Sequence, residues 1–217
     1  MDTFTPTDRT RIKRSHERAH YDRETVYGIL DAGLVCHVGY CFEGQPFVAS
    51  TAYWREGDRV VWHGSSASRM IRALRGGVQC CFNVSLWDGI VIARSGYHSS
   101  MNYRSVIIYG EAEQITGVDA KEAALKNFID RLWPGRWEEM RPINKQEMKA
   151  TTVLALPIAE AAAKVRTGPP LDDEEDYDDD IWAGVQPVSL NFGAPEPDPR
   201  LKTGIPVPPY LKRFSLD

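Results

Sequence analysis

The segment GSSASR, residues 64–69, has side chains that could bind a phosphate. It lies where a strand-like run ends and a helical pattern begins. The first N–H groups of a helix have no partner within the helix, and the helix dipole is positive at that end. Ser65, Ser66 and Ser68 add hydroxyl donors, and the planar guanidinium of Arg69 suits a phosphate. The alternative is that a serine caps the helix and that Arg69 is solvated.

His63 directly precedes this turn, at the end of the strand-like run. Histidine titrates near neutral pH, so it could transfer a proton to a cofactor or a substrate lying over the end of the strand. A histidine that only packs in the core or lies on the surface is the other reading. The sequence therefore offers His63 as a candidate catalytic residue.

A second polar segment, YHSSMNYRS, covers residues 97–105 and leads into a long strand-like run. Hydroxyls, an amide and a guanidinium close to the start of a strand suit recognition of the polar edge of a heteroaromatic ring. A surface loop explains the same residues equally well.

Composition limits the classes of protein and of partner. A chain of 217 residues with 42% apolar residues can form a core. No run of about 18 apolar residues and no apolar signal segment occurs, which predicts a cytoplasmic protein without a membrane partner. Residues 172–180, DDEEDYDDD, account for the net charge of −4. Such a run is typical of a solvated mobile loop, although a metal site is the alternative.

The remaining charge and the cysteines exclude further classes. Without the acidic run the chain is mildly basic. It has no basic face with interleaved aromatic residues, so a nucleic-acid partner is not expected. The four cysteines Cys36, Cys41, Cys80 and Cys81 show no CxxC spacing. We expect no bound metal and no disulfide, and interpret the cysteines as small core side chains.

Alternating apolar residues and turn dipeptides predict short antiparallel strands. Glu43-Gly44 separates two of them, and Asp88-Gly89 is typical of another hairpin turn. Strands are expected over residues 34–42, 45–54, 59–64, 78–87, 90–97, 105–115 and 151–158. Helices are expected over residues 22–32 and 119–133, with a short one after a capping box at Asn144 and Glu147.

This pattern indicates a mainly β protein, a small barrel with flanking helices. A barrel of this size is filled by its own side chains, so a ligand is expected outside it or between subunits. We divide the chain into an N-terminal arm (1–22), a barrel domain (23–166) and an acidic, proline-rich tail (167–217) packed on the barrel or on a dimer partner.

The motifs HGSSASRMIRAL, NYRSVIIYGEAE and KVRTGPPLDDEED, followed by WAGV, resemble one known family. They are similar to the FMN-binding split barrels of the pyridoxamine 5'-phosphate oxidase-like superfamily, in the branch that includes the nitroimidazole-resistance proteins. The resemblance covers about residues 23–188. It implies an antiparallel split β-barrel of Greek-key type that forms a homodimer with flavin at the subunit interface.

The resemblance also implies roles for individual residues. His63 is the implied catalytic residue, and Met70 stands where the oxidases have a lysine. The uncharged FVASTAY replaces the basic strand of those oxidases, so pyridoxamine phosphate is not the expected substrate. The implied FMN-binding residues are Ser50, Thr51, His63, Gly64, Ser65, Ser68, Arg69, Asn102, Tyr103, Arg104 and Ser105.

The resulting expectation is an FMN-binding flavoprotein, a reductase or oxidase that acts on a small molecule. The flavin would supply the redox chemistry, and the protein would supply orientation and electrostatics. Two alternatives stay open, a non-catalytic flavin or haem carrier and a deazaflavin-dependent reductase.

Overall fold

The structure is a computed structural model and describes residues 2–214. Its sheet is antiparallel, with the strand order β1-β9-β6-β5-β2-β3-β4-β8-β7, and β10 pairs with β5 beside this series. The strands are β1 Ala19–His20, β2 Val35–Phe42, β3 Gln45–Glu56, β4 Arg59–Ser65, β5 Gln79–Ile92, β6 Ser100–Glu111, β7 Glu113–Gln114, β8 Thr151–Pro157, β9 Glu160–Arg166 and β10 Gly184–Pro187. The helices are α1 Arg23–Ala32, α2 Arg69–Arg75, α3 Val118–Leu132, α4 Arg136–Glu139 and α5 Lys145–Ala150, with 3-10 turns η1 His16–Arg18, η2 Glu174–Asp178 and η3 Pro209–Phe214.

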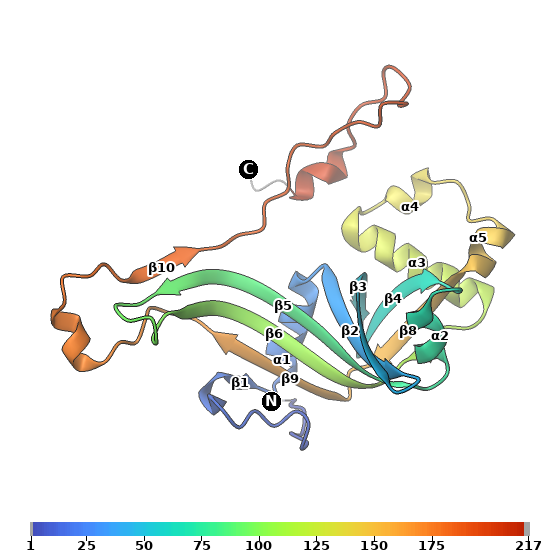
Figure 1. Ribbon diagram of the computed structural model, residues 1–217. Coiled ribbons are helices and arrows are strands. Elements are labelled where there is room, and N and C mark those ends of the chain that lie inside the picture. The colour runs from blue at the N-terminus through green and yellow to red at the C-terminus, as the bar shows by residue number, and fades with distance from the viewer. Residues whose placement is uncertain (1, 215–217) are drawn as a thin grey trace.

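The long strand β3 divides the sheet into two parts. Residues 45–52 of β3 pair with β2, whereas residues 53–56 pair with β4. The sheet can therefore bend between its two halves, and Figure 1 shows β5 and β6 curving away from β4 and β8. This arrangement confirms the expected antiparallel split barrel with flanking helices.

Two hydrophobic clusters lie on opposite faces of β3 and β4. The larger cluster contains Tyr53 and Trp62, together with residues of α1, α2 and most strands. The smaller contains Trp54 and Val61, with Ala124 and Leu125 of α3. Because successive side chains of a strand point to opposite faces, neighbouring residues of β3 and β4 alternate between the two clusters.

Several local predictions are confirmed. The hairpin between β2 and β3 turns at Glu43-Gly44, where both residues have positive φ angles of 50° and 75°, as a type I′ turn requires. Asn144 and Glu147 form the expected capping box of α5. Gly110 lets the Leu156 side chain of β8 approach β6 closely, because a Cβ atom at position 110 would lie 3.0 Å from Leu156 Cδ1.

Other predictions differ from the structure. Asp88-Gly89 is not a hairpin turn but an irregularity inside the single strand β5, where the register against β6 shifts between Trp87 and Gly89. The sequence pattern missed β9, because its buried run of alanines at residues 161–163 shows no alternation. The sequence also gave no signal that the N-terminal arm packs on the barrel, where Phe4 is 4% exposed within the main core.

The acidic run is exposed over most of its length, as expected of a solvated segment, but it begins with a buried carboxylate. It contains η2, and the Asp172 side chain is fully buried against Arg94 at 3.0 Å. After β10 the chain leaves the body of the protein as an extended tail, and η3 lies near α4 (Figure 1). Within residues 2–214, no helix has both the length and the apolar character needed to cross a membrane.

Candidate functional site

The turn between β4 and α2 presents the predicted phosphate-binding groups. Ser68 is the N-cap of α2, and its Oγ accepts a hydrogen bond from the Ile71 N–H at 3.3 Å. The capping alternative is thus confirmed for Ser68. A hydroxyl that accepts one bond still has its hydrogen to donate, so the cap does not prevent contact with an anion. Ser65 is exposed beside it.

The guanidinium of Arg69 packs by one face on an aromatic ring, and the N–H groups along its edge are unpaired within residues 2–214. Its guanidinium carbon lies 4.5 Å from the centre of the Phe47 ring in β3. It is exposed, and no ion pair or hydrogen bond of its guanidinium is found among residues 2–214. Stacking on an aromatic ring uses the face of the guanidinium and leaves its N–H groups available for a phosphate.

Gly64 has a packing role at this turn. A Cβ atom there would lie 3.1 Å from Ile71 Cγ1, so the absence of a side chain lets α2 approach the end of β4. The turn is also fixed from its other side, because the Ser66 N–H donates to the Ala150 carbonyl at 2.8 Å and Ser66 Oγ donates to the Lys149 carbonyl at 3.2 Å. The end of α5 therefore adjoins the turn.

His63 lies in an aromatic environment beside the turn. Its ring centre is 5.2 Å from Phe128 of α3 and 6.1 Å from Trp54 of β3. Nδ1 is buried without a hydrogen-bond partner, and no hydrogen bond to Nε2 is found in the described part of the chain. Burial lowers the pKa of His63, so its neutral form is favoured. A neutral imidazole with free ring nitrogens can bind a metal or accept a proton.

The cavity next to His63 is small and mostly apolar. Its volume is about 260 Å³, and its lining is formed by His63, Leu125, Phe128, Ile129, Trp137, Met140, Ile143, Glu147 and Thr151. Complete small-molecule sites typically have volumes of about 300–1,000 Å³. The cavity within one chain therefore has room for only part of a large planar ligand.

Ser50 and Thr51 do not share one face of β3. Ser50 is exposed and, by alternation, lies on the face of Trp54, the residue that contacts His63. Thr51 points to the opposite face. Of these two residues, which the resemblance implies bind the flavin, only Ser50 has its side chain on the same face of β3 as Trp54, which contacts His63.

The same face of the sheet carries uncovered apolar side chains. Val35 of β2, Val48 of β3 and Trp87 of β5 are 52%, 72% and 59% exposed. The pairing of β2 with β3 and β5 places all three on the face opposite the main core. This broad exposed surface of the sheet adjoins Ser50.

The second predicted segment forms internal contacts. Arg104 forms a bidentate pair with Asp88 at 2.8 and 2.7 Å, where the register of β5 shifts. Asn102 is buried, donates to the Gly168 carbonyl at 3.0 Å and accepts a hydrogen bond from Arg166. Tyr103 is half-buried. Ser105 Oγ lies 3.4 Å from the Lys164 carbonyl. Asn102 thus holds the chain after β9 in place, whereas Arg104 links β6 to β5.

The fold does not bring the two predicted segments together within one chain. Gln79, which follows α2, pairs with Glu111 at the far end of β6 from Asn102. Arg104 precedes Glu111 by seven residues, which corresponds to roughly 23 Å along a strand. Figure 1 shows α2 and the start of β6 at opposite ends of the sheet.

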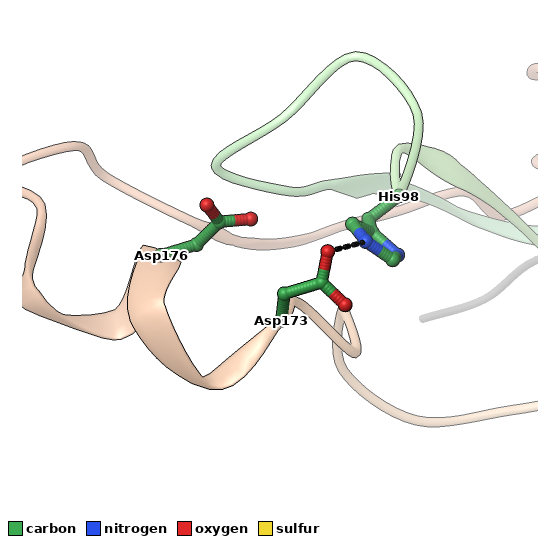
Figure 2. A group of neighbouring side chains, drawn as sticks. All are labelled: His98, Asp173 and Asp176. Carbon is green, nitrogen blue, oxygen red and sulfur yellow. Dashed lines mark ion pairs between the residues drawn. The ribbon is translucent and has the colours of Figure 1, made fainter.

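The sequence offered a metal site as the alternative for the acidic run but did not point to His98. His98, Asp173 and Asp176 form a group that could hold a metal ion. Their ligand atoms lie within 4.8 Å of one another, and His98 Nε2 is 3.3 Å from Asp173 Oδ2 (Figure 2). Arg94 also stacks on Tyr177 at 4.7 Å. Together with Asp172, these contacts attach the acidic segment to the hairpin between β5 and β6. No signal in the sequence links residue 98 to residues 173 and 176.

A comparison with known protein families agrees with this fold and with the turn at residues 64–69. The sequence model described as pyridoxamine 5'-phosphate oxidase matches residues 22–165, and the chain belongs to this family, as its motifs predicted. No curated protein gives a significant match.

Two solved structures match nearly the whole chain. The flavocytochrome Anf3 from Azotobacter vinelandii is 52% identical, with a TM-score of 0.93 over 99% of this chain and 100% of that one. The FAD and heme binding protein from Mycobacterium smegmatis is 36% identical, with a TM-score of 0.87 over 91% and 97%. A putative 5-nitroimidazole antibiotic resistance protein from Bacteroides thetaiotaomicron is 20% identical, with a TM-score of 0.57 over 68% and 86%, and supports the fold alone.

Proposed function

We propose that this chain is a flavin- and haem-binding oxidoreductase that functions as a homodimer. The observation that carries this proposal is His63, whose ring nitrogens have no partner within residues 2–214 and which lies beside the turn with its free arginine. Support also comes from the two relatives at 52% and 36% identity, a flavocytochrome and an FAD and heme binding protein.

Ser65, Ser68 and Arg69 are the groups that would hold the flavin phosphate. FMN, the flavin expected from the sequence, and FAD both contain this phosphate, so the turn suits either of them. The isoalloxazine ring would lie over the exposed face of β3 at Ser50. When bound, the flavin and the haem would supply electron transfer, and the protein would supply binding and orientation.

His63 would bind the haem iron. Burial lowers its pKa and so favours the neutral ring, which is the form of imidazole that binds iron. Its surroundings are aromatic and aliphatic, as the apolar faces of a macrocycle require. The same residue was the candidate proton donor, a role that a group with a lowered pKa fills poorly near neutral pH.

The second subunit would complete this site. The cavity of about 260 Å³ beside His63 is too small for a whole haem, and the exposed face with Val35, Val48 and Trp87 needs a cover. A second copy placed over this face would enlarge the site beside His63 and would cover the exposed apolar side chains. It would also provide another set of residues 102–105 near the flavin of its partner, as the family resemblance implies.

An absorption spectrum of the purified protein tests the proposal. We expect flavin bands and a haem Soret band together, with close to one of each group per chain. The His63→Gln variant should keep the flavin and lose at least about 100-fold in haem affinity, since even outer-shell partners of a metal change affinity by about 10–100-fold. His16→Gln, on an exposed histidine of η1, is the control, and His37→Gln tests the exposed histidine that pairs with Ser50 across β2 and β3.

Three results would contradict the proposal. A protein that binds neither group in titrations excludes it, and haem loss in His37→Gln but not in His63→Gln excludes the assigned ligand. A monomer in sedimentation experiments on the loaded protein excludes the shared site. Reduction of the bound flavin by a nicotinamide cofactor, followed by turnover with a small-molecule acceptor, would separate the enzyme from a carrier.

A further inference from the structure

Three side chains from two distant segments meet at the tip of the long hairpin of β5 and β6. His98 lies in the turn between the two strands, and Asp173 and Asp176 lie at the start of the acidic segment, residues 172–180. Their ligand atoms lie within 4.8 Å of one another, and Figure 2 shows one oxygen of Asp176 directed toward the other two residues. One imidazole and two carboxylates are therefore close enough to share one ion.

Contacts of other residues hold both halves of this group in place. The Asp172 side chain is fully buried and accepts hydrogen bonds at 3.0 Å from the backbone N–H and from the guanidinium of Arg94. The Tyr177 ring packs on the same guanidinium at 4.7 Å. In the turn, the backbone N–H of His98 donates to Ser95 Oγ at 3.2 Å. The side chains of the three candidate ligands are thus brought together without having to bind one another.

The charge of the acidic segment is a separate indication of a bound cation. Of its eight carboxylates, only Asp172 and Asp173 face a basic side chain among those that the structure describes, Arg94 and His98 respectively. Asp176 has no ion pair and no side-chain hydrogen bond there, although its ligand oxygen lies within 4.8 Å of that of Asp173. Two ionised carboxylates at this distance repel each other, and a cation between them removes the repulsion. The group therefore lacks the positive charge that a divalent ion would supply.

The ligand types favour a transition-metal ion over Ca²⁺ or Mg²⁺. Imidazole nitrogen together with carboxylate oxygen suits Zn²⁺ and similar ions, whereas Ca²⁺ and Mg²⁺ prefer a full set of oxygen ligands. Zn²⁺ is usually bound by four groups at the corners of a tetrahedron. The three side chains provide three of these groups, and Asp173 is 72% exposed, so water can supply the fourth.

We propose that His98, Asp173 and Asp176 form a binding site for a divalent transition-metal ion such as Zn²⁺. The ion would tie the chain after β9 to the tip of the hairpin, beside the ion pair of Arg94 and Asp172. Strand β10 follows the acidic segment and pairs with β5, so the same ion would help to keep β10 in place. The site is separate from the turn at residues 64–69, and the proposal does not depend on flavin or haem binding.

Calorimetric titration of the full-length protein with Zn²⁺, after dialysis against a chelator, tests this site. We expect a site for one Zn²⁺ per chain that His98→Gln weakens by at least about 100-fold, since even outer-shell partners of a metal change its affinity by about 10–100-fold. Asp176→Asn should weaken it by at least about tenfold. The Asp176 side chain has no partner to lose in the described part of the chain, so this variant should fold like the parent. Zn²⁺ binding that is equal in the parent and in both variants would overturn the proposal.

Two matched variants separate a site from the general attraction of an acidic segment. Asp179→Asn removes the same charge from an exposed carboxylate outside the group, and His16→Gln removes an exposed histidine of η1. Both should leave the Zn²⁺ affinity within about twofold of the parent. Equal losses in Asp176→Asn and Asp179→Asn would show that the segment only attracts counterions, and the site would then be wrong. Ca²⁺ binding to the parent as tightly as Zn²⁺ would contradict it as well.

Limited proteolysis by an enzyme that cleaves after glutamate gives an independent measurement. Glu174 and Glu175 are exposed within the acidic segment, and Glu17 is an exposed glutamate of η1. Zn²⁺ at about ten times its Kd should slow cleavage after Glu174 and Glu175 about tenfold, because an ion that binds only the folded segment lowers the population of the open one. Cleavage after Glu17 should not change, and His98→Gln should lose the protection. Cleavage of the parent segment at the same rate with and without Zn²⁺ would overturn the site.

Discussion

The two polar segments at opposite ends of the long strands differ in how many of their hydrogen-bonding groups the fold leaves free. At the turn before α2, Arg69 has a free edge and His63 has two ring nitrogens without a partner in the described chain. At the start of β6, Arg104 pairs with Asp88, and Asn102 contacts Arg166 and Gly168. Both segments are rich in polar side chains, but only the first keeps binding capacity within one chain.

This difference shows that polar composition alone does not identify a ligand site. A buried polar group without a partner is costly, so a fold normally pairs such groups, and unpaired ones indicate a binding role. The segment at Asn102 has partners because the chain after β9 turns back over it. At His63 most neighbouring side chains are apolar or aromatic, from α3 and the segment that follows it, and none of them forms a hydrogen bond with the ring in the described chain.

The largest effect is expected for Arg166→Met, because Arg166 pairs with the polar segment at Asn102. The side chain is 7% exposed and donates to Asn102 and to the Gly168 and Pro169 carbonyls, at 3.4 and 3.2 Å for the carbonyls. Removing it leaves buried acceptors unpaired, which lowers the free energy of unfolding by about 3 kcal/mol. Urea denaturation measures this change.

Lys164→Met, two residues earlier on β9, is the control for Arg166→Met. Lys164 forms no side-chain ion pair within residues 2–214, so its loss should change the free energy of unfolding by less than about 0.5 kcal/mol. If Arg166→Met is no more destabilising than this control, the segment at Asn102 is not held by the contacts described.

A smaller effect, on binding and not on stability, is expected for Arg69→Met at the open turn. Loss of a charge-assisted contact of about 1.5–3 kcal/mol lowers flavin affinity by about 10–100-fold. The melting temperature of the flavin-free protein should hardly change, because Arg69 is exposed. Flavin titration and thermal melting measure the two quantities.

Arg72→Met provides the comparison for Arg69→Met, since Arg72 is an exposed arginine one turn further along α2. It should leave flavin affinity within about twofold of the parent. Equal losses in both variants would show that the positive charge of α2, and not the position of Arg69, attracts the flavin.

The smallest effect is the pH dependence that His63 gives to the flavin- and haem-free protein. Burial lowers its pKa in the folded state, whereas the unfolded chain has a pKa of about 6.5. Below pH of about 6.5 the unfolded state binds a proton that the folded state does not, so stability falls as the pH drops toward the folded pKa. Above this range the contribution is constant.

His63→Phe removes this titration and keeps an aromatic ring next to Phe128. Urea denaturation of both proteins between pH 5 and pH 7 should show the parent losing more stability than the variant as the pH falls. Parallel curves for the two proteins would contradict the burial of His63 and with it the contrast between the two segments.

The sequence by itself determined the elements whose signals are local. Alternating apolar residues marked β2 to β6 and β8, and side-chain caps marked the ends of α2 and α5, because these features depend only on neighbouring residues. The motifs at residues 63–74, 102–113 and 164–185 together indicated the family before the fold was known. The sequence left open whether Arg69 binds a phosphate or is solvated, and the structure shows it stacked on Phe47.

Only the tertiary structure decided which polar groups stay free. Arg104 meets Asp88 because the register of β5 shifts, and Asp172 meets Arg94 across 78 residues of sequence. A cleft between α3 and α5 is lined by Lys121 and Lys145, which are 24 positions apart in the sequence. Such contacts follow from strand order and packing, which depend on the whole chain, so no local pattern in the sequence could predict them.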